Sequence, residues 1–260
     1  MAERRVYVPP GEIYGDRAVI KGDQAHHLVS VLRKKPGDDI VVFDGEGTEC
    51  AARILRIGRD LVVARVHRKE VHDKAGRPAV ALYAAVPKGR KFDLIVEEAT
   101  ELGADSITPL LTERTVVKLE DHNIPAKLDR WRRITVAAAK QCRRSTLPQL
   151  NWPVDFSDAV QDIPESAFPI LACSSGSSLP LQDVLADIAP SHKEIRVYIG
   201  PEGGFSPQEI ETARNTGMRL ASLGGNILRT ETAALASLSV INCFLDSHAE
   251  DSAPVLDGEK

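Results

Sequence analysis

Apolar residues in the first 70 positions occur in short runs that alternate with turn-forming sequences. The breaks carry Gly, Pro and Asp, as in PPGE, KPGDD, DGEG and GRD, and such clusters separate strands. Residues 23–33 differ, because Leu28, Val31 and Leu32 recur there at helical spacing. The expected strands are residues 6–8, 18–20, 40–43, 49–57 and 61–66. So many short strands predict a small β-barrel over residues 1–72.

From residue 79 the pattern changes to alternating strands and helices. Residues 79–86 form a continuous apolar run, typical of a strand covered on both faces. Residues 88–102 repeat apolar positions at helical spacing and end before Gly103. Further strands are expected at 106–111, 168–173, 195–199 and 219–223, and further helices at 126–142, 181–188, 207–216 and 232–244. This alternation predicts an α/β domain over residues 73–246, a mainly parallel sheet flanked by helices.

Two segments carry little apolar material. Residues 72–78 (HDKAGRP) contain glycine and proline and are expected to link the two domains. Residues 247–260 (SHAEDSAPVLDGEK) are polar and acidic. We expect them to form a disordered tail, because they cannot bury enough apolar surface to fold.

The composition narrows the classes of protein. The chain has 260 residues, of which 43% are hydrophobic and 27% charged, as in ordinary globular proteins. No apolar run approaches the ~20 residues of a membrane span, and the N-terminus MAERRVYVPP lacks the apolar stretch of a secretory signal. Four scattered Cys and seven His without paired spacing indicate neither a disulfide framework nor a metal site. We therefore expect a cytoplasmic protein.

Charge is distributed unevenly along the chain. Residues 1–150 contain 27 Lys and Arg against 21 Asp and Glu, whereas residues 151–260 contain 6 against 16. Fields from exposed charges decay over about 8–10 Å in physiological salt, so a polyanion would sense the basic part separately. The overall net charge of −4 argues against indiscriminate nucleic-acid binding. It favours a localised contact, although uneven surface charge without a partner gives the same count.

The first candidate site is the glycine-rich sequence at 199–209 (IGPEGGFSPQE). It follows an expected strand, and open α/β sheets bind ligands at the carboxyl ends of their strands. Ser206, Pro207 and Glu209 have the spacing of a helix capping box with Pro at the first helical position. The loop is neither a Walker A sequence nor GxGxxG, which argues against a triphosphate or a dinucleotide. A ligand loop and a tight strand-to-helix turn both remain open.

The second candidate site is residues 223–233 (LGGNILRTETA), where a strand again runs into glycines and a helix. Arg229 and Glu231 lie where a buried helix is expected to begin. Burying a guanidinium costs several kcal/mol unless it is paired. Two interpretations follow: Glu231 neutralises Arg229, or Arg229 faces a cavity that receives an anion.

Together the two loops closely resemble the paired signature of the 16S rRNA (uracil-N3)-methyltransferases, the RsmE family of the SPOUT superfamily. Outside the loops, shorter sequences are similar to the same family over almost the whole chain except the acidic tail. They are His27 with Val31-Leu32-Arg33, Phe43-Asp44-Gly45, Lys88-Gly89, Glu101-Leu102-Gly103, Thr108-Pro109, Glu113-Arg114, and Gln141 with Arg144 and Pro148.

The resemblance implies a fold, a cofactor and an assembly. The fold is a PUA-like RNA-binding β-barrel followed by a knotted, SPOUT-type methyltransferase domain. The cofactor is S-adenosyl-L-methionine, the active form is a homodimer, and the substrate is ribosomal RNA in the small subunit, assembled rather than free. The implied cofactor-binding residues are Leu171, Ala172, Ile199, Gly200, Pro201, Glu202, Gly203, Leu223, Gly224, Ile227, Leu228, Thr230, Thr232 and Ala233.

The chain departs from the family at several positions. Glu98 replaces the usual Lys, Arg143 stands where Gly is common, and Asn226 stands where a basic residue occurs. Residues 172–175 match the family's first cofactor loop only loosely. These differences concern single residues and leave the class unchanged.

The chemistry implied for N3 of uracil requires loss of an imide proton. As the proton leaves, negative charge spreads onto O2 and O4, and a charged donor there is worth about 1.5–3 kcal/mol. We expect Arg229 to supply that charge. Glu231, or a water molecule, would accept the proton, or Glu231 would orient the arginine.

Basic residues of the first 150 are the expected RNA contacts. Any single one of them could equally be a solvated surface charge. As a set they predict a steep salt dependence of binding. The candidates are Arg5, Arg33, Lys34, Lys35, Lys88, Arg90, Lys91, Gln141, Arg143 and Arg144.

Three other functions compete with this interpretation. The same fold could modify a 2′-O-ribose or a tRNA guanine. The chain could be an RNA-binding ribosome-assembly factor with an inactive cofactor pocket. A nucleotide hydrolase is disfavoured, because the lysine of a phosphate-binding loop is missing.

Overall fold

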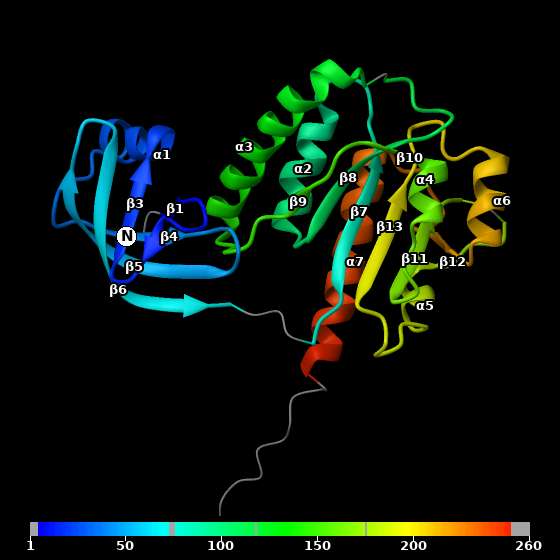
Figure 1. Ribbon diagram of the computed structural model, residues 1–260. Coiled ribbons are helices and arrows are strands. Elements are labelled where there is room, and N and C mark those ends of the chain that lie inside the picture. Colours follow the sequence, from blue (N-terminus) through cyan, green and yellow to red (C-terminus); the bar gives the residue numbers. More distant parts are fainter. Residues whose placement is uncertain (1–4, 73–75, 118, 175, 251–260) are drawn as a thin grey trace, which may run out of the picture. The chain divides into compact units, whose positions relative to one another are not determined.

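A computed structural model describes residues 5–72, 76–117, 119–174 and 176–250. The chain divides into two compact units (Figure 1). Unit 1 comprises Met1–Lys74 and Val136–Leu147, and unit 2 comprises Ala75–Thr135 and Pro148–Lys260. Each unit has its own hydrophobic core.

Unit 1 contains one six-stranded sheet that curls around a core. The strand order is β1-β4-β5-β6-β3-β2, with β1 parallel to β4 and the other neighbours antiparallel. Alternate strand residues such as Val42, Ile54 and Val62 are fully buried, because side chains of a strand alternate between its faces. The small N-terminal β-domain predicted from the sequence is confirmed. Its strands are β1 (Arg5–Tyr7), β2 (Ile13–Tyr14), β3 (Arg17–Lys21), β4 (Asp39–Phe43), β5 (Thr48–Ile57) and β6 (Leu61–Val71).

The helix expected at 23–33 is shorter and less regular. Helix α1 (Gly22–His26) continues into a π-helical turn, η1 (His27–Val31). Leu28 is buried as expected, but Val31 is exposed, because the wider π-turn changes the angular spacing of the residues after it. The helix ends before Arg33, whose φ of 53° is left-handed.

Residues 136–147 belong to unit 1 although they are distant from it in sequence. They form the end of helix α3 (Ile124–Cys142) and the loop that follows. The backbone N–H of Leu147 donates to Gly45 O at 2.8 Å, and that of Gly47 donates to Ser145 O at 3.3 Å. Arg143 follows the helix with a φ of 64°. A left-handed position suits glycine, the residue that the family resemblance leads us to expect there.

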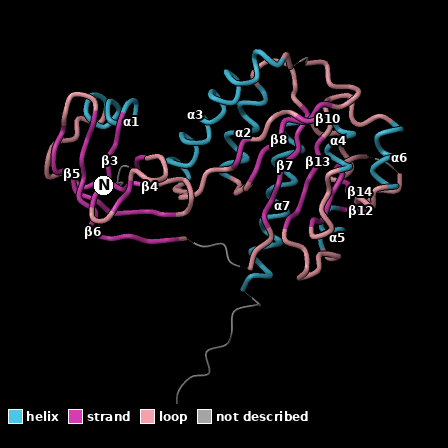
Figure 2. The backbone as a smooth tube through the Cα atoms, in the orientation of Figure 1, coloured by secondary structure: helices cyan, strands magenta, loops and turns pink. Residues whose placement is uncertain are grey.

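Unit 2 contains an eight-stranded parallel sheet with helices on both faces (Figures 1 and 2). The strand order is β10-β8-β7-β13-β11-β14-β12, and β9 also pairs with β8. All of these pairs are parallel. The strands are β7 (Ala79–Ala85), β8 (Ser106–Leu111), β9 (Gln149–Leu150), β10 (Val154–Asp155), β11 (Ala167–Ala172), β12 (Leu179–Pro180), β13 (Glu194–Ile199) and β14 (Arg219–Ser222).

The two faces of this sheet are covered by different helices. One hydrophobic cluster joins the sheet to α2, α5 and α7, and a second joins it to α4 and α6. The predicted parallel sheet flanked by helices is thus confirmed, whereas the knot remains a prediction. The helices are α2 (Lys91–Glu101), the 3-10 turn η2 (Asp121–Asn123), α4 (Phe156–Gln161), α5 (Leu181–Leu185), α6 (Pro207–Asn215) and α7 (Thr230–Glu250).

The end of α7 corrects one boundary. The helix continues to Glu250, so residues 247–250 are helical where we expected the disordered tail to begin. His248 stacks on Phe244, four residues earlier, with ring centroids 4.1 Å apart. This contact lies between the expected end of the helix and its continuation. The rest of the predicted tail, 251–260, and residues 73–75 of the predicted linker lie outside the described residues.

Candidate functional site

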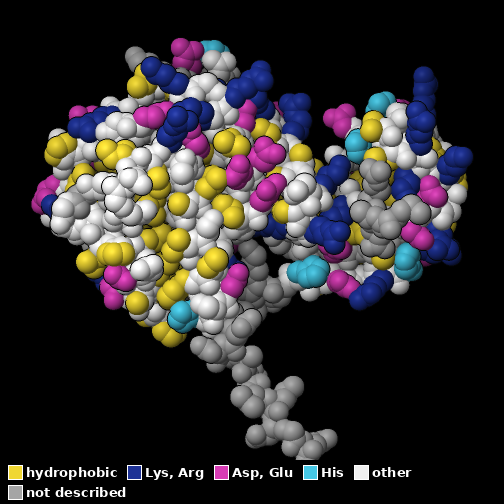
Figure 3. Space-filling view, turned by 180° about the vertical axis from the view of Figure 1, so that it is seen from behind, with side chains coloured by type: hydrophobic (Ala, Val, Ile, Leu, Met, Phe, Trp, Pro, Cys, Tyr) yellow, Lys and Arg dark blue, Asp and Glu magenta, His cyan; other side chains and the backbone are white. Residues whose placement is uncertain are grey.

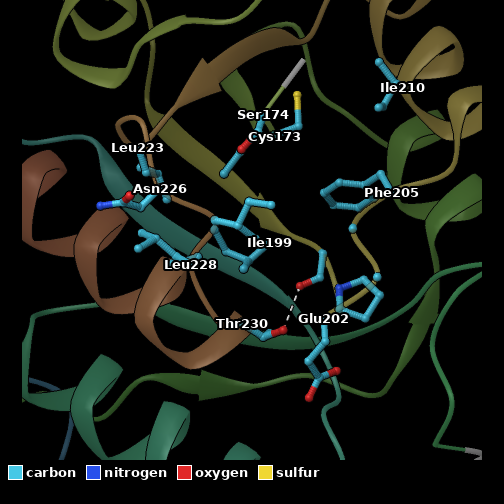
Figure 4. A pocket seen from close by; sticks show the side chains of 17 residues that line it. Cys173, Ser174, Ile199, Glu202, Phe205, Ile210, Leu223, Asn226, Leu228 and Thr230 are labelled. Atoms are coloured by element: carbon cyan, nitrogen blue, oxygen red, sulfur yellow. Dashed lines mark hydrogen bonds between the residues drawn. The ribbon is translucent and has the colours of Figure 1, made fainter. Parts of the chain in front are cut away.

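A cavity of about 360 Å³ opens at the carboxyl edge of the unit 2 sheet (Figure 4). It is bounded by the segments that follow β11, β13 and β14, which are neighbours in the sheet. Their carboxyl ends meet at one edge because the strands are parallel. Segments from three distant parts of the sequence therefore form one site.

The segment after β13 is fixed by a helix cap at its far end. The Glu209 backbone N–H donates to Ser206 Oγ at 3.2 Å, and the Ser206 N–H donates to Glu209 Oε2 at 2.7 Å. The capping box predicted from the sequence is therefore present. The other carboxylate oxygen of Glu209 accepts from the Glu113 N–H at 2.9 Å. This buried carboxylate thus joins α6 to the segment that follows β8.

Close packing explains the glycines of this loop. A Cβ at Gly200 would lie 3.1 Å from the Phe205 ring and 3.3 Å from the Gly204 carbonyl carbon. Gly204 has a φ of 66°, a conformation that glycine adopts readily. Arg114 donates from Nη1 to Gly203 O at 2.7 Å. This contact between Arg114 and the glycine loop was not predicted. In the sequence, Glu113-Arg114 served only as part of the resemblance to the family.

The segment after β14 closes the cavity from the other side. Thr230 Oγ1 donates to Gly200 O at 3.0 Å and ties the two glycine loops together, as the dashed line in Figure 4 marks. Leu223 and Leu228 give the cavity an apolar wall. Ile227 also lines it and yet is 90% exposed.

Most of the predicted cofactor residues line this cavity. Leu171 does not, because it is fully buried in the core beneath the sheet. Gly224 and Thr232 are also absent from the lining; Thr232 lies on α7 between Thr230 and Ala233, which do line it. The predicted residues brought together are Ala172, Ile199, Gly200, Pro201, Glu202, Gly203, Leu223, Ile227, Leu228, Thr230 and Ala233.

Six further residues line the cavity without having been predicted. Gly204, Phe205 and Ile210 could have been inferred from the same loop and its capped helix, since they flank the predicted glycines. Cys173 and Ser174 fall in the segment whose resemblance to the family is loose. The sixth, Asn226, stands where the resemblance led us to expect a basic residue. The set is Cys173, Ser174, Gly204, Phe205, Ile210 and Asn226.

The predicted catalytic pair does not form an ion pair. Glu231 Oε1 lies 3.4 Å from Lys91 Nζ, so the interpretation in which Glu231 neutralises Arg229 is wrong. Arg229 is exposed and has no ion pair among the described residues. Both residues lie beside the cavity lining rather than within it. The second interpretation, an arginine accessible to an anion, stays open.

One predicted RNA contact is structural. The Arg5 side chain is 8% exposed and forms an ion pair with Glu49. Its Nη2 donates to Arg144 O at 3.1 Å, and its guanidinium lies 4.9 Å from the centroid of the Phe43 ring. Arg5 is therefore committed to the interior of unit 1, where the ion pair offsets the desolvation of its charge.

The other predicted RNA contacts are nearer the surface. Lys34 and Arg144 are partly tied down, because Lys34 Nζ donates to Asp39 O at 3.0 Å and Arg144 Nε donates to Thr146 Oγ1 at 2.8 Å. Lys91 forms ion pairs with the carboxylates of Glu202 and Glu231. Lys and Arg side chains are prominent on unit 1 (Figure 3). The exposed candidates are Arg33, Lys35, Lys88, Arg90, Gln141 and Arg143.

The described residues offer little to a metal ion or a membrane. They contain no group of three or more His, Cys, Asp or Glu that could hold a metal. Within the same ranges, no helix has the length and apolar character that crossing a membrane requires.

Comparisons with known proteins match both units. Residues 75–242 match the family model of the RNA methyltransferase domain, and residues 20–66 match that of the RNA methyltransferase PUA domain. The chain is 34% identical over 245 residues to ribosomal RNA small subunit methyltransferase E from Synechocystis, covering 94% of this chain and 78% of that protein.

Two solved structures are similar over nearly the whole length. One is a putative methyltransferase from Legionella pneumophila in complex with S-adenosylmethionine, with a TM-score of 0.83, 30% identity, and coverage of 94% of this chain and 98% of that one. The other is ribosomal RNA small subunit methyltransferase E from Neisseria gonorrhoeae bound to S-adenosylmethionine, with a TM-score of 0.82, 27% identity and the same coverage.

Proposed function

The chain belongs to the ribosomal RNA small subunit methyltransferase E family, and from this premise we propose that it methylates N3 of a uridine in 16S rRNA. The methyl donor is S-adenosylmethionine, which two structural relatives were crystallised with. The substrate is the assembled small subunit, and the working form is a cytoplasmic homodimer. The observation that carries the proposal is the cavity between the two glycine loops.

The cavity suits a cofactor without phosphates. Its walls combine apolar side chains, such as Ile199 and Leu228, with backbone from Gly200 and Gly203. The one charged residue among the described residues that line it is Glu202. A carboxylate at the rim is compatible with a positively charged sulfonium and unfavourable for a phosphate.

The residues present would bind and orient the donor. When bound, S-adenosylmethionine supplies an activated methyl group. The Thr230–Gly200 hydrogen bond holds the two loops at a fixed separation, and the capping box fixes the end of the first loop. Such alignment of two reactants contributes about 7–11 kcal/mol to lowering a barrier. The protein's part is therefore mainly positional.

Arg229 and Glu231 would act on the base. The exposed guanidinium of Arg229, which has no ion pair among the described residues, can stabilise negative charge on O2 or O4 as the N3 proton leaves. The Glu231 carboxylate can accept that proton. The target base has to leave its stack to reach this edge of the sheet. These roles follow from chemistry and position beside the cavity.

Nucleoside analysis tests the proposal directly. Small subunits from a strain lacking this protein are incubated with the purified protein and S-adenosylmethionine, and the digested rRNA is analysed by mass spectrometry. We expect 3-methyluridine. A methylated guanine or a 2′-O-methylated ribose would instead indicate another position, and bound cofactor without any methyl transfer would indicate an assembly factor.

An arginine variant tests the mechanism in the same assay. Arg229→Ala is expected to reduce turnover about 100-fold and to leave the Kd for S-adenosylmethionine nearly unchanged, because Arg229 does not line the cavity. Arg132→Ala, an exposed arginine on α3, is the matched control and is expected to retain full activity. Near-normal turnover of Arg229→Ala would remove this residue from the mechanism.

A further inference from the structure

Lys91 lies between two carboxylates on different segments. Its Nζ is 3.4 Å from Glu202 Oε1 and 3.4 Å from Glu231 Oε1. Glu202 belongs to the cavity loop after β13, and Glu231 to the first turn of α7. Figure 4 shows the Glu202 side chain extending away from Ile199 and Phe205. One ammonium group thus joins the start of α2, the cofactor loop and the start of α7.

The position of Lys91 is unfavourable for its own helix. It is the first residue of α2, and the N-terminus of a helix carries a partial positive charge that favours anions over cations. The two carboxylates compensate for that repulsion. The contacts with Glu202 and Glu231 therefore explain a lysine at this position, whereas the stability of α2 does not.

Glu231 is held at one oxygen only. Its side chain is 12% exposed, and Oε1 faces Lys91. The other oxygen, Oε2, is inaccessible to solvent and has no hydrogen-bond partner among the described residues. An unpartnered buried acceptor is destabilising, and more so when it is charged. Among the described residues, Lys91 is therefore the partner that fixes this carboxylate.

We infer that Lys91 is a positioning residue, which holds the Glu231 side chain at Oε1 and links it through Glu202 to the cofactor loop. It is then not the RNA phosphate contact expected from the sequence. Lysine suits this role, because its compact charge with three rotatable donors can serve two carboxylates at once. The inference rests on the proposed function, since Glu231 has a part only in methyl transfer.

Steady-state kinetics of Lys91→Gln distinguish positioning from RNA contact. We expect kcat to fall about 10–100-fold, because a displaced reacting group costs this much. The KM for small subunits and its salt dependence are expected to stay at wild-type values, since no phosphate contact is lost. Lys91→Arg retains the charge and is expected to recover most of kcat, which also covers the case in which Lys91→Gln does not fold.

Coupling to Glu231 adds a second readout. Lys91→Gln and Glu231→Gln act on one unit, so the double variant is expected to lose no more than Glu231→Gln alone. Arg132→Gln, with an equal loss of charge on α3, is expected to leave kcat unchanged.

Three outcomes would overturn the inference. They are an unchanged kcat in Lys91→Gln, a raised KM with a flatter salt dependence, and losses that multiply in the double variant. Any methyl transfer by the wild-type protein serves as the assay. A methylated nucleoside other than 3-methyluridine would therefore refute the proposed specificity and leave the test of Lys91 intact.

Discussion

Single residues of the cofactor cavity could be predicted where the signal lies within one short stretch of the sequence. Glycine followed by a helix cap after an apolar strand identifies a ligand loop without knowledge of its neighbours, and Gly200, Gly203 and Ser206 were found in this way. Arg114 was not, because its hydrogen bond to Gly203 O joins segments 89 residues apart. One of the two interpretations of Arg229 paired it with Glu231 and failed for the same reason: Arg229 is two residues away in sequence, whereas Lys91 lies 3.4 Å away in space.

Gly200 lines the cavity at a point where a side chain would have no room. Gly200→Ala is expected to raise the Kd for S-adenosylmethionine about tenfold, equivalent to ~1.4 kcal/mol. The added methyl group would lie 3.1 Å from Phe205 and 3.3 Å from Gly204, so the loop has to shift. Overpacking of this kind also lowers the unfolding free energy by about 1–3 kcal/mol. Isothermal titration calorimetry and denaturant unfolding measure the two effects.

Gly225→Ala provides the control at the neighbouring loop. No atom lies within 4 Å of a Cβ placed there, and the φ of Gly225 is not left-handed. Its cofactor affinity and stability are expected to match the wild type. Equal effects of the two substitutions would mean that any loss of loop flexibility, rather than the contact with Phe205, controls binding.

At the scale of elements, long and strongly patterned segments were predicted well. The expected strands at 106–111 and 195–199 correspond to β8 and β13, and the expected helix at 207–216 to α6. Strands β9, β10 and β12 were missed, because two residues carry no period. Residues 136–147 could not be assigned to unit 1, because helical spacing says nothing about which unit a helix end packs in.

Helix α6 is the element that fixes the cofactor loop, and Glu209 is its anchor. Glu209→Ala is expected to lower the unfolding free energy by about 2–3 kcal/mol, because the N–H groups of Ser206 and Glu113 lose their shared acceptor. The Kd for S-adenosylmethionine is expected to rise as well, since the loop is released. Thermal unfolding and calorimetry check both. Glu211→Ala on the exposed face of α6 removes only a surface ion pair with Arg214 and is expected to stay within about 0.5 kcal/mol of the wild type.

At the scale of the whole molecule, the net charge of the chain and the charge of its exposed basic residues lead to different expectations for RNA binding. The chain carries −4 overall, so binding to a polyanion has to depend on a few accessible cations. Six of the ten predicted contacts are exposed, among them Arg33 and Lys35. Arg5 is not, because its guanidinium is paired with Glu49 inside unit 1. We therefore expect some of these arginines and lysines, such as Arg5, to contribute to stability, and the exposed ones to contribute to RNA binding.

The salt dependence of rRNA binding makes this separation measurable. Each phosphate contact contributes about 0.7–0.9 to the slope of log K against log salt. Arg33→Gln and Lys35→Gln are each expected to reduce that slope by about this amount and to leave the unfolding free energy unchanged within ~0.5 kcal/mol. Arg59→Gln, at the exposed turn between β5 and β6, removes the same charge from the same unit and is expected to leave the slope unaltered. If Arg59→Gln flattens the slope as much as Arg33→Gln, then the charge of unit 1 as a whole attracts RNA, and no localised footprint exists.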